Sequence, residues 1–165
     1  MTTATALDIK VADEVWIATA LLHREHPDQA DFSVAEIMNR VRQEGLTETL
    51  RAGVQPHIYL HCVANLPPNP SRKRMLFETS KGRRRLFRKG DTYHPDRERG
   101  DIVPDFQRLP AEYAPLLDWY SEWSSDQIRK SLREDPLLGL RGSGKQIWAD
   151  EHADEYIRRL REGWL

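Results

Sequence analysis

The sequence predicts an α+β fold that is mainly α. Three observations predict it: apolar residues at helical spacing fill the first third of the chain, two β-prone runs joined by a turn follow, and amphipathic segments return towards the C-terminus. The 165 residues suffice for one ordinary domain with an appendage. With 39% hydrophobic and 31% charged residues, the chain has the composition of a globular protein.

Apolar residues at helical spacing predict the first helix, over residues 10–26, which ends before Pro27. A second helix is predicted to begin at Ser33, because Ser33 and Glu36 form a capping-box pattern. Gly45 supplies its C-terminal stop. The buried faces are predicted to contain Val11, Val15, Ala18 and Leu22 in the first helix, and Ile37 and Val41 in the second.

A third, shorter helix is predicted over residues 54–66. Pro56 suits its first turn, and an apolar residue recurs at every fourth position, as one face of a helix requires. The sequence PPNP at residues 67–70 ends it, because proline interrupts helical hydrogen bonding. Its predicted core positions are Ile58, Cys62 and Leu66.

Two β-prone runs follow, over residues 72–80 and 83–88, and a turn around Gly82 joins them. They predict a β-hairpin. Three helices closed by a two-stranded ribbon make a winged helix-turn-helix. We therefore expect a winged helix-turn-helix domain over residues 1–100.

The remainder of the chain is predicted to divide in two. An extended connection over residues 91–110 should wrap the hairpin, and residues 101–134 should contain a helix whose aromatic face closes the core. Residues 135–165 should hold a glycine-punctuated linker and a helix that ends at Gly163. The closing face is predicted to contain Tyr113, Leu116, Leu117, Tyr120 and Trp123.

Charge is distributed unevenly along the chain, although the net charge is only −1. Residues 51–100 hold 12 Lys and Arg against 4 Asp and Glu, a net charge of +8. Residues 1–50 and 101–165 carry net charges of −5 and −4. A basic surface on an otherwise acidic protein is what binding to a phosphate backbone requires.

The hairpin is the expected phosphate-binding surface, because its basic side chains alternate with apolar ones that hold the ribbon to the helices. Basic side chains that neutralise phosphates release counterions, which adds affinity for double-stranded DNA. The alternative is a solvated, charged edge strand that avoids pairing with other sheets. The expected phosphate ligands are Arg72, Lys73, Arg74, Lys81, Arg83, Arg84, Arg85 and Arg88, with Lys89 next to them.

If the hairpin is the wing, the third helix enters the major groove and its non-core positions face base edges. Gln and Asn can form two hydrogen bonds with adenine, and His can donate to guanine acceptors. The same residues would also be ordinary on the surface of any helix. The candidates are Gln55, His57, Tyr59, His61 and Asn65.

We expect no catalytic site, no cofactor and no metal. His57, His61 and His94 could be metal ligands with Cys62, but Cys62 lies on the apolar stripe, where a buried thiol is the simpler interpretation. No nucleophile elbow or paired-carboxylate motif stands out. The function that these observations predict is that of a DNA-binding transcriptional regulator. The alternatives are a small nuclease that uses acidic residues of the segment 91–105, a restriction-associated accessory protein, and an interaction module without DNA binding.

The sequence predicts a cytoplasmic protein that does not enter a membrane. Its N-terminus lacks a basic stretch followed by an apolar run, and the chain has no run of about 18 apolar residues. The single cysteine, Cys62, excludes an intramolecular disulfide, so packing must stabilise the fold.

The C-terminal helix is expected to bind another protein or a second copy of this chain. It carries an aromatic and apolar stripe with little domain of its own to cover it, and such stripes fit grooves on partners. The alternative is that the helix folds back on its own domain. The expected docking residues are Trp148, Tyr156, Arg158, Leu160, Arg161 and Trp164.

Two segments resemble known families. The run HIYLHCVAN, residues 57–65, between an acidic-aromatic helix and a basic hairpin, resembles winged-helix domains of the HARE-HTH type, found with bacterial restriction enzymes and regulators. That resemblance implies a winged helix that contacts DNA. The segment LRGSGKQIWADEHADEYIRRLREGW, residues 140–164, resembles the toxin-binding C-terminus of type II antitoxins that neutralise PIN-domain ribonucleases. This second resemblance implies a toxin-like protein partner.

Overall fold

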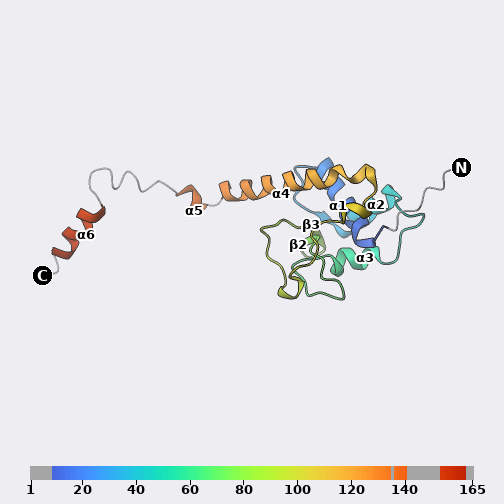
Figure 1. Ribbon diagram of the computed structural model, residues 1–165, viewed down its shortest axis with the longest axis horizontal. Coiled ribbons are helices and arrows are strands. Elements are labelled where there is room, and N and C mark those ends of the chain that lie inside the picture. Colours follow the sequence, from blue (N-terminus) through green and yellow to red (C-terminus); the bar gives the residue numbers. More distant parts are fainter. Residues whose placement is uncertain (1–8, 135, 141–152, 163–165) are drawn as a thin grey trace. The chain divides into compact units, whose positions relative to one another are not determined.

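The computed structural model describes residues 9–134, 136–140 and 153–162. It is an α+β structure, mainly helical, with a three-stranded antiparallel sheet (Figure 1). No helix within the described ranges is long and apolar enough to cross a membrane. The elements in chain order are α1 (Val11–Glu25), β1 (Phe32–Ser33), α2 (Val34–Glu44), α3 (Val54–Pro56), the π-helix η1 (His57–His61), β2 (Leu76–Ser80), β3 (Arg83–Leu86), the 3-10 helices η2 (Pro95–Arg97), η3 (Phe106–Arg108) and η4 (Ala111–Tyr113), α4 (Pro115–Glu134), α5 (Pro136–Gly139) and α6 (Ala153–Glu162).

The first two helices begin and end where the sequence predicts. At the start of α2, the Ser33 hydroxyl accepts a hydrogen bond from the Glu36 amide at 3.2 Å, and the Glu36 carboxylate accepts one from the Ser33 amide at 2.7 Å. This capping box satisfies two amide groups that a helix start otherwise leaves unpaired. Gly45 ends α2 with a φ of 60°, a left-handed conformation that glycine adopts without strain.

The third predicted helix is shorter than expected and wound differently. One turn of α3 passes into η1, in which the Cys62 amide donates to the His57 carbonyl at 3.1 Å, the wider spacing of a π-helix. Ile58 and Cys62 are fully buried, as predicted, whereas Leu66 lies beyond the helix and is partly buried. The helix ends early because the Cys62 carbonyl accepts a hydrogen bond from Leu76, at the start of β2.

The sheet has the order β1-β3-β2, and both pairs of strands are antiparallel. β2 and β3 form the predicted hairpin, with Gly82 in the turn at a φ of 77° and an irregularity between Glu78 and Ser80. The sequence does not predict β1, because two residues are too few to show strand alternation. β1 pairs Phe32 with Arg84, which places β3 in the centre of the sheet.

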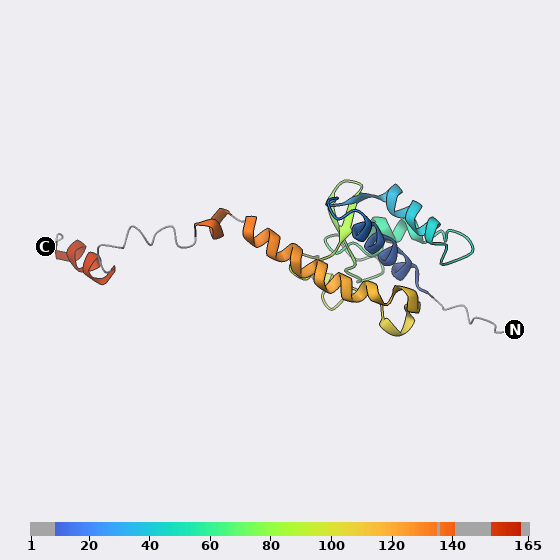
Figure 2. The ribbon, with the colours of Figure 1, turned by 90° about the horizontal axis from the view of Figure 1, so that it is seen from above.

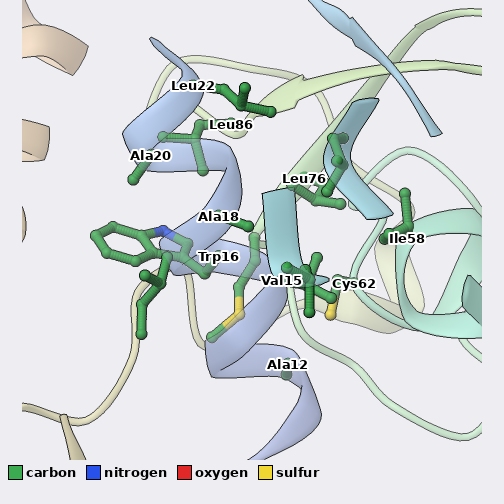
Figure 3. Packing of buried hydrophobic residues seen from close by; sticks show 14 of the residues in the cluster. Ala12, Val15, Trp16, Ala18, Ala20, Leu22, Ile58, Cys62, Leu76 and Leu86 are labelled. Atoms are coloured by element: carbon green, nitrogen blue, oxygen red, sulfur yellow. The ribbon is translucent and has the colours of Figure 1, made fainter. Parts of the chain in front are cut away.

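The hydrophobic core surrounds α1, in which residues 12–23 are all buried. Trp16 is the largest fully buried side chain. Because neighbouring elements cover every side of α1, its sequence is more continuously apolar than that of a one-sided surface helix. Figure 3 shows core residues from α1, from η1 and its C-terminal end, and from the hairpin: Val15, Trp16, Ile58, Cys62, Leu76 and Leu86.

The first half of α4 closes the core, as the sequence predicts. Leu116 and Tyr120 are buried, and the Tyr120 ring meets Trp16 edge-on at a centroid distance of 5.7 Å. Figure 2 shows α1 and this half of α4 side by side. The Tyr120 hydroxyl donates to the Phe87 carbonyl at 2.5 Å. The compact unit therefore extends to Ser124, beyond the expected boundary at residue 100, and the rest of the chain is a second unit.

The connection after the hairpin runs against the segment that leads into β2. The Arg74 amide donates to the Asp101 carbonyl at 2.8 Å, and the Arg74 side chain donates to the Gly100 carbonyl at 3.2 Å. A Cβ at Gly100 would lie 1.8 Å from the carbonyl oxygen of Arg72, so only glycine permits this backbone crossing. The connection was expected to wrap the hairpin, and in the structure it contacts the segment just before β2.

Candidate nucleic-acid interface

The short helical segment formed by α3 and η1 presents two polar side chains to solvent. Gln55 is exposed, and Tyr59, one turn further on, is 47% exposed. An adjacent face of the segment is anchored by Val54 and Ile58, which are fully buried. Gln55 and Tyr59 are therefore the two predicted base-edge residues that a nucleic acid could contact without rearrangement of the segment.

His57 and His61 are half-buried on the same segment, with ring centroids 4.8 Å apart. Nδ1 of His57 lies 2.7 Å from the Gly53 carbonyl oxygen and must carry a hydrogen, because a carbonyl can only accept. Burial lowers the pKa of His57, which favours the neutral ring. One ring nitrogen of His57 thus holds the start of the helical segment and is not available to a base.

Asn65, the fifth predicted base-edge residue, is bound to the sheet. Its Nδ2 donates to the Glu78 carbonyl and its Oδ1 accepts from the Glu78 amide, both at 2.9 Å. The side-chain amide therefore pairs with β2 as a neighbouring strand would. The predicted helix over residues 54–66 would have placed Asn65 on a helix surface, whereas the chain has already left the helix there.

Arg84 is buried rather than exposed on the wing. Its guanidinium donates to the carbonyls of Ile58 and Tyr59, both at 3.2 Å, and forms an ion pair with Glu78 at 2.9 Å. The side chain is 3% exposed, and burial lowers its pKa. The guanidinium also lies 6.0 Å from the centre of the Tyr59 ring. Arg84 thus fastens η1 to β3 and positions Tyr59 instead of meeting phosphate.

Arg83 and Arg85, on either side of Arg84, are also paired within the protein. Arg83 donates to the Asp31 carboxylate at 2.5 Å and remains 40% exposed. Arg85 donates through both terminal nitrogens to Asp91, at 2.6 and 2.7 Å, and is 10% exposed. A guanidinium paired with a carboxylate contributes little to a phosphate-binding field, and Arg85 is in addition largely covered.

Arg74 and Arg88 stack on aromatic rings. The Arg74 guanidinium lies 4.3 Å from the centre of the Tyr93 ring, and that of Arg88 lies 5.2 Å from the centre of the Trp123 ring. The pKa of Arg88 is lowered by burial and then by the neighbouring Arg85, and its buried Nε has no hydrogen-bond partner. Both arginines hold the ends of the hairpin to adjacent segments.

The remaining basic residues of the predicted set keep their charge at the surface. Arg72, Lys81 and Lys89 are exposed. Lys73 is partly covered and forms an ion pair with Asp101 at 3.2 Å. The surface on which phosphate could bind is therefore smaller than the sequence predicts, and Lys81 stands at the hairpin turn.

Arg97, which sequence reasoning did not select, is the most completely buried basic residue of the described chain. Its nitrogens lie 2.6 to 3.1 Å from six backbone carbonyl oxygens, which belong to Pro67 within the PPNP segment, to residues on either side of that segment and to the end of η1. A guanidinium suits this position because its planar fork presents five donors. No local sequence pattern predicts this role of Arg97. The one indication in the sequence is the PPNP segment, because its prolines leave nearby carbonyl groups without helical hydrogen-bond partners. The six acceptors are Leu60, His61, Leu66, Pro67, Ser71 and Lys73.

Several of the residues considered for metal binding or hydrolysis have partners within the protein, whereas Asp96 and Glu98 are exposed. Within residues 9–134, 136–140 and 153–162, no group of three or more His, Cys, Asp or Glu could hold a metal ion. Burial raises the pKa of the Cys62 thiol to about 12, so it is not a thiolate at neutral pH. Of the acidic side chains considered for a nuclease, Asp91 pairs with Arg85, Asp101 pairs with Lys73, and Asp105 accepts from the Gln107 amide at 3.0 Å.

Part of the predicted docking helix is α6. Arg158 and Arg161 are exposed on it, and Ile157 is 47% exposed. The predicted docking residues Trp148 and Trp164 lie outside the described residues, as do the side chains of Tyr156 and Leu160. The expected linker contains one described helical turn, α5.

Comparison of the chain with protein-family models, with curated proteins and with solved structures found no match.

Proposed function

We propose that the chain is a DNA-binding transcriptional regulator whose compact unit is a winged helix-turn-helix. The observation that carries the proposal is the exposed face of α3 and η1, where Gln55 and Tyr59 stand on a segment that buried Arg84 fastens to the hairpin. A rigid helical segment with two polar side chains beside a ribbon suits insertion into the major groove. A backbone segment that is already held in place loses little conformational entropy on binding.

The order of the elements supports the same proposal. The second and third helical segments are followed by a hairpin, and β1, between α1 and α2, adds a third strand to that hairpin. A helix-turn-helix places its second helix against DNA, and a ribbon beside it can reach the phosphate backbone. In the proposed complex, Gln55 and Tyr59 read bases and Lys81 meets a phosphate.

The test is a fluorescence-anisotropy titration of the full chain against duplexes of random and selected sequence at two salt concentrations. Lys81→Ala should weaken binding to all sequences and lower the salt slope by about 1, because one phosphate contact is lost. Gln55→Ala should instead alter sequence preference. Arg24→Ala removes an exposed charge in the last turn of α1, outside α3, η1 and the hairpin, and is the matched control.

Two results would reject the proposal. One is the absence of binding at low salt; the other is an equal loss of affinity in the Lys81 and Arg24 variants. Arg84→Ala does not substitute for the Lys81 variant, because it removes a buried ion pair and destabilises the fold itself. Binding lost only through unfolding appears as a lowered Tm and not as a changed salt slope.

A partner-binding role for the C-terminal helix is the second part of the proposal. It is supported by Ile157, an exposed branched apolar side chain on α6 that is followed by Arg158 and, one turn further on, by Arg161. An apolar anchor flanked by Arg158 and Arg161 suits a groove with an acidic rim, such as the toxin-like partner that the sequence resemblance implies. Calorimetric titration of the full chain with PIN-domain ribonucleases tests this. Ile157→Glu should abolish binding, and retained binding would show that α6 is not the anchor.

A further inference from the structure

The second half of α4 carries two apolar side chains outside the described core cluster, of which Ile128 is partly buried and Leu132 is exposed. The compact unit ends at Ser124, whereas α4 continues to Glu134. In this half, Ile128 and Leu132 are four residues apart and so lie on neighbouring positions of one helix face. Leu132 is 53% exposed. Two apolar side chains alone do not indicate which partner binds this face of α4. The charged residues beside them do indicate one.

Five charged residues follow one flank of α4 at spacings of three or four residues. The first three are acidic and the last two are basic, and all five are exposed. Among them, Asp126 and Arg129 pair within the helix at 3.6 Å, with more than 70% of each side chain exposed. In chain order the flank consists of Asp118, Glu122, Asp126, Arg129 and Arg133.

The helix dipole does not account for this separation of charge. It favours acidic residues in the first turn and basic residues in the last turn, and its effect falls off beyond them. Glu122, Asp126 and Arg129 stand in the middle of a helix of 20 residues. A partner helix with the opposite order of charges would complement the flank, and a second copy of α4 running antiparallel has that order.

We propose that two copies of this chain associate through the second half of α4, as an antiparallel pair of helices. A two-fold axis across the pair brings the same flank of each helix together in opposite directions, so Glu122 and Asp126 of one copy face Arg129 and Arg133 of the other. Ile128 and Leu132 then lie in the contact. A parallel pair related by a two-fold axis would instead set this flank against the opposite flank of the partner helix, which does not repeat the charge pattern, so the charges would lack complementary partners.

The contact is small, which sets its expected strength. Two half-helices bury less than the roughly 1,200 Å² of a stable interface, so we expect dimerisation in about the micromolar range. This inference does not depend on DNA binding. A monomeric chain that binds DNA would reject the dimer alone, and a dimeric chain that binds no DNA would reject the proposed function alone.

The test is sedimentation velocity of the full chain over a concentration series across the micromolar range. Leu132→Glu should leave a monomer with an unchanged Tm, because Leu132 is exposed and outside the compact unit. Lys130→Glu changes a charge of the same helix that is not on the flank, and it should leave the dimer intact. A monomeric wild-type chain, or a dimer that survives Leu132→Glu, would overturn the proposal.

Charge reversal gives a second and sharper readout. A chain with Arg129→Glu and Arg133→Glu has an entirely acidic flank, and one with Glu122→Lys and Asp126→Lys has a mainly basic flank. Each should dimerise about tenfold more weakly than the wild type or worse, because like charges then face each other. A chain with all four reversals should recover dimerisation, since the antiparallel pattern is restored. Failure of this recovery would overturn the antiparallel arrangement.

Discussion

The guanidinium of Arg85 and the carboxylate of Asp91 form a two-point ion pair, with nitrogen–oxygen distances of 2.6 and 2.7 Å. Both side chains are largely covered, at 10% and 14% exposure. Asp91 also accepts a hydrogen bond from the Arg88 amide at 2.7 Å, so the pair closes the chain just after β3. A residue from the most basic run of the sequence is thus used to close a loop.

This pair predicts a non-additive pattern of stability. Arg85→Ala should lower the free energy of unfolding by about 3 kcal/mol, because Asp91 is left covered and unpaired. Asp91→Ala should have a similar effect, and the double variant should cost less than the sum of the two. Urea unfolding of the three variants measures the coupling. Additive losses, or no loss in either single variant, would show that the pair does not stabilise the loop.

We expect that position 97 does not tolerate substitution, even by lysine. Arg97→Lys keeps the charge but offers three donors on one nitrogen to carbonyls that surround a planar fork. We expect a loss of about 3 kcal/mol or more in the free energy of unfolding, because several carbonyls and a buried charge lose their partners. Arg99→Lys, at an exposed position two residues away, is the control. Equal stability of the two variants would contradict the assignment.

His23 predicts a pH dependence of stability. It is buried between Phe32 and Trp123, and its Nε2 accepts from the Leu86 amide at 3.3 Å. Burial, with Arg88 and Arg85 nearby, lowers its pKa from 6.5 to about 3, whereas Asp31 acts in the opposite direction. The unfolded chain therefore binds the proton more readily than the folded chain.

The contribution of His23 to stability is complete above about pH 6.5 and is lost as the pH falls towards about 3. Between these values one proton accounts for a slope of up to about 1.4 kcal/mol per pH unit. His23→Gln should remove this part of the slope in urea unfolding curves measured from neutral to acid pH. If the free energy of unfolding of the wild type and of the variant changed with pH in the same way, His23 would not be the cause of this slope.

Labelling of the single cysteine, Cys62, can be used to follow unfolding of the chain. Cys62 is fully buried and burial raises its pKa to about 12, so a maleimide should not label the native chain at neutral pH. Labelling should appear with unfolding in urea and follow the same transition as circular dichroism. Rapid labelling without denaturant would show that the end of η1 opens locally. Cys62→Ala, which removes the thiol, is the control for reagent specificity.

Local patterns predicted the helices and turns well, because their partners are close in sequence. Ser33 and Glu36 lie three residues apart, so their capping box is visible in the sequence and the structure contains it. Gly45 and Gly82 mark their turns for the same reason. The predicted end of the third helix was wrong, because the helix ends where the Cys62 carbonyl bonds to Leu76 of β2, which is distant in the sequence.

The roles of the arginines could not be predicted, because their partners are distant in sequence. Arg83 pairs with Asp31, 52 residues earlier, and Arg97 binds the Leu60 carbonyl, 37 residues earlier. Charge counts predict where a basic surface can lie but do not separate an exposed Lys81 from a buried Arg84 three residues away. Only the packing of β3 against η1 makes that distinction.

The side-chain amide of Asn65 also limits how a partner can recognise this protein. Recognition by strand addition needs a row of unpaired backbone groups along a sheet edge. On β2, Asn65 already pairs with both backbone groups of Glu78, and Leu76 exchanges hydrogen bonds with the Cys62–Ala64 segment. An extended peptide has no template along this edge, which also protects the native chain from cross-β aggregation there. A partner that contacts the protein along β2 must therefore be recognised through side chains, and single substitutions there should alter its specificity.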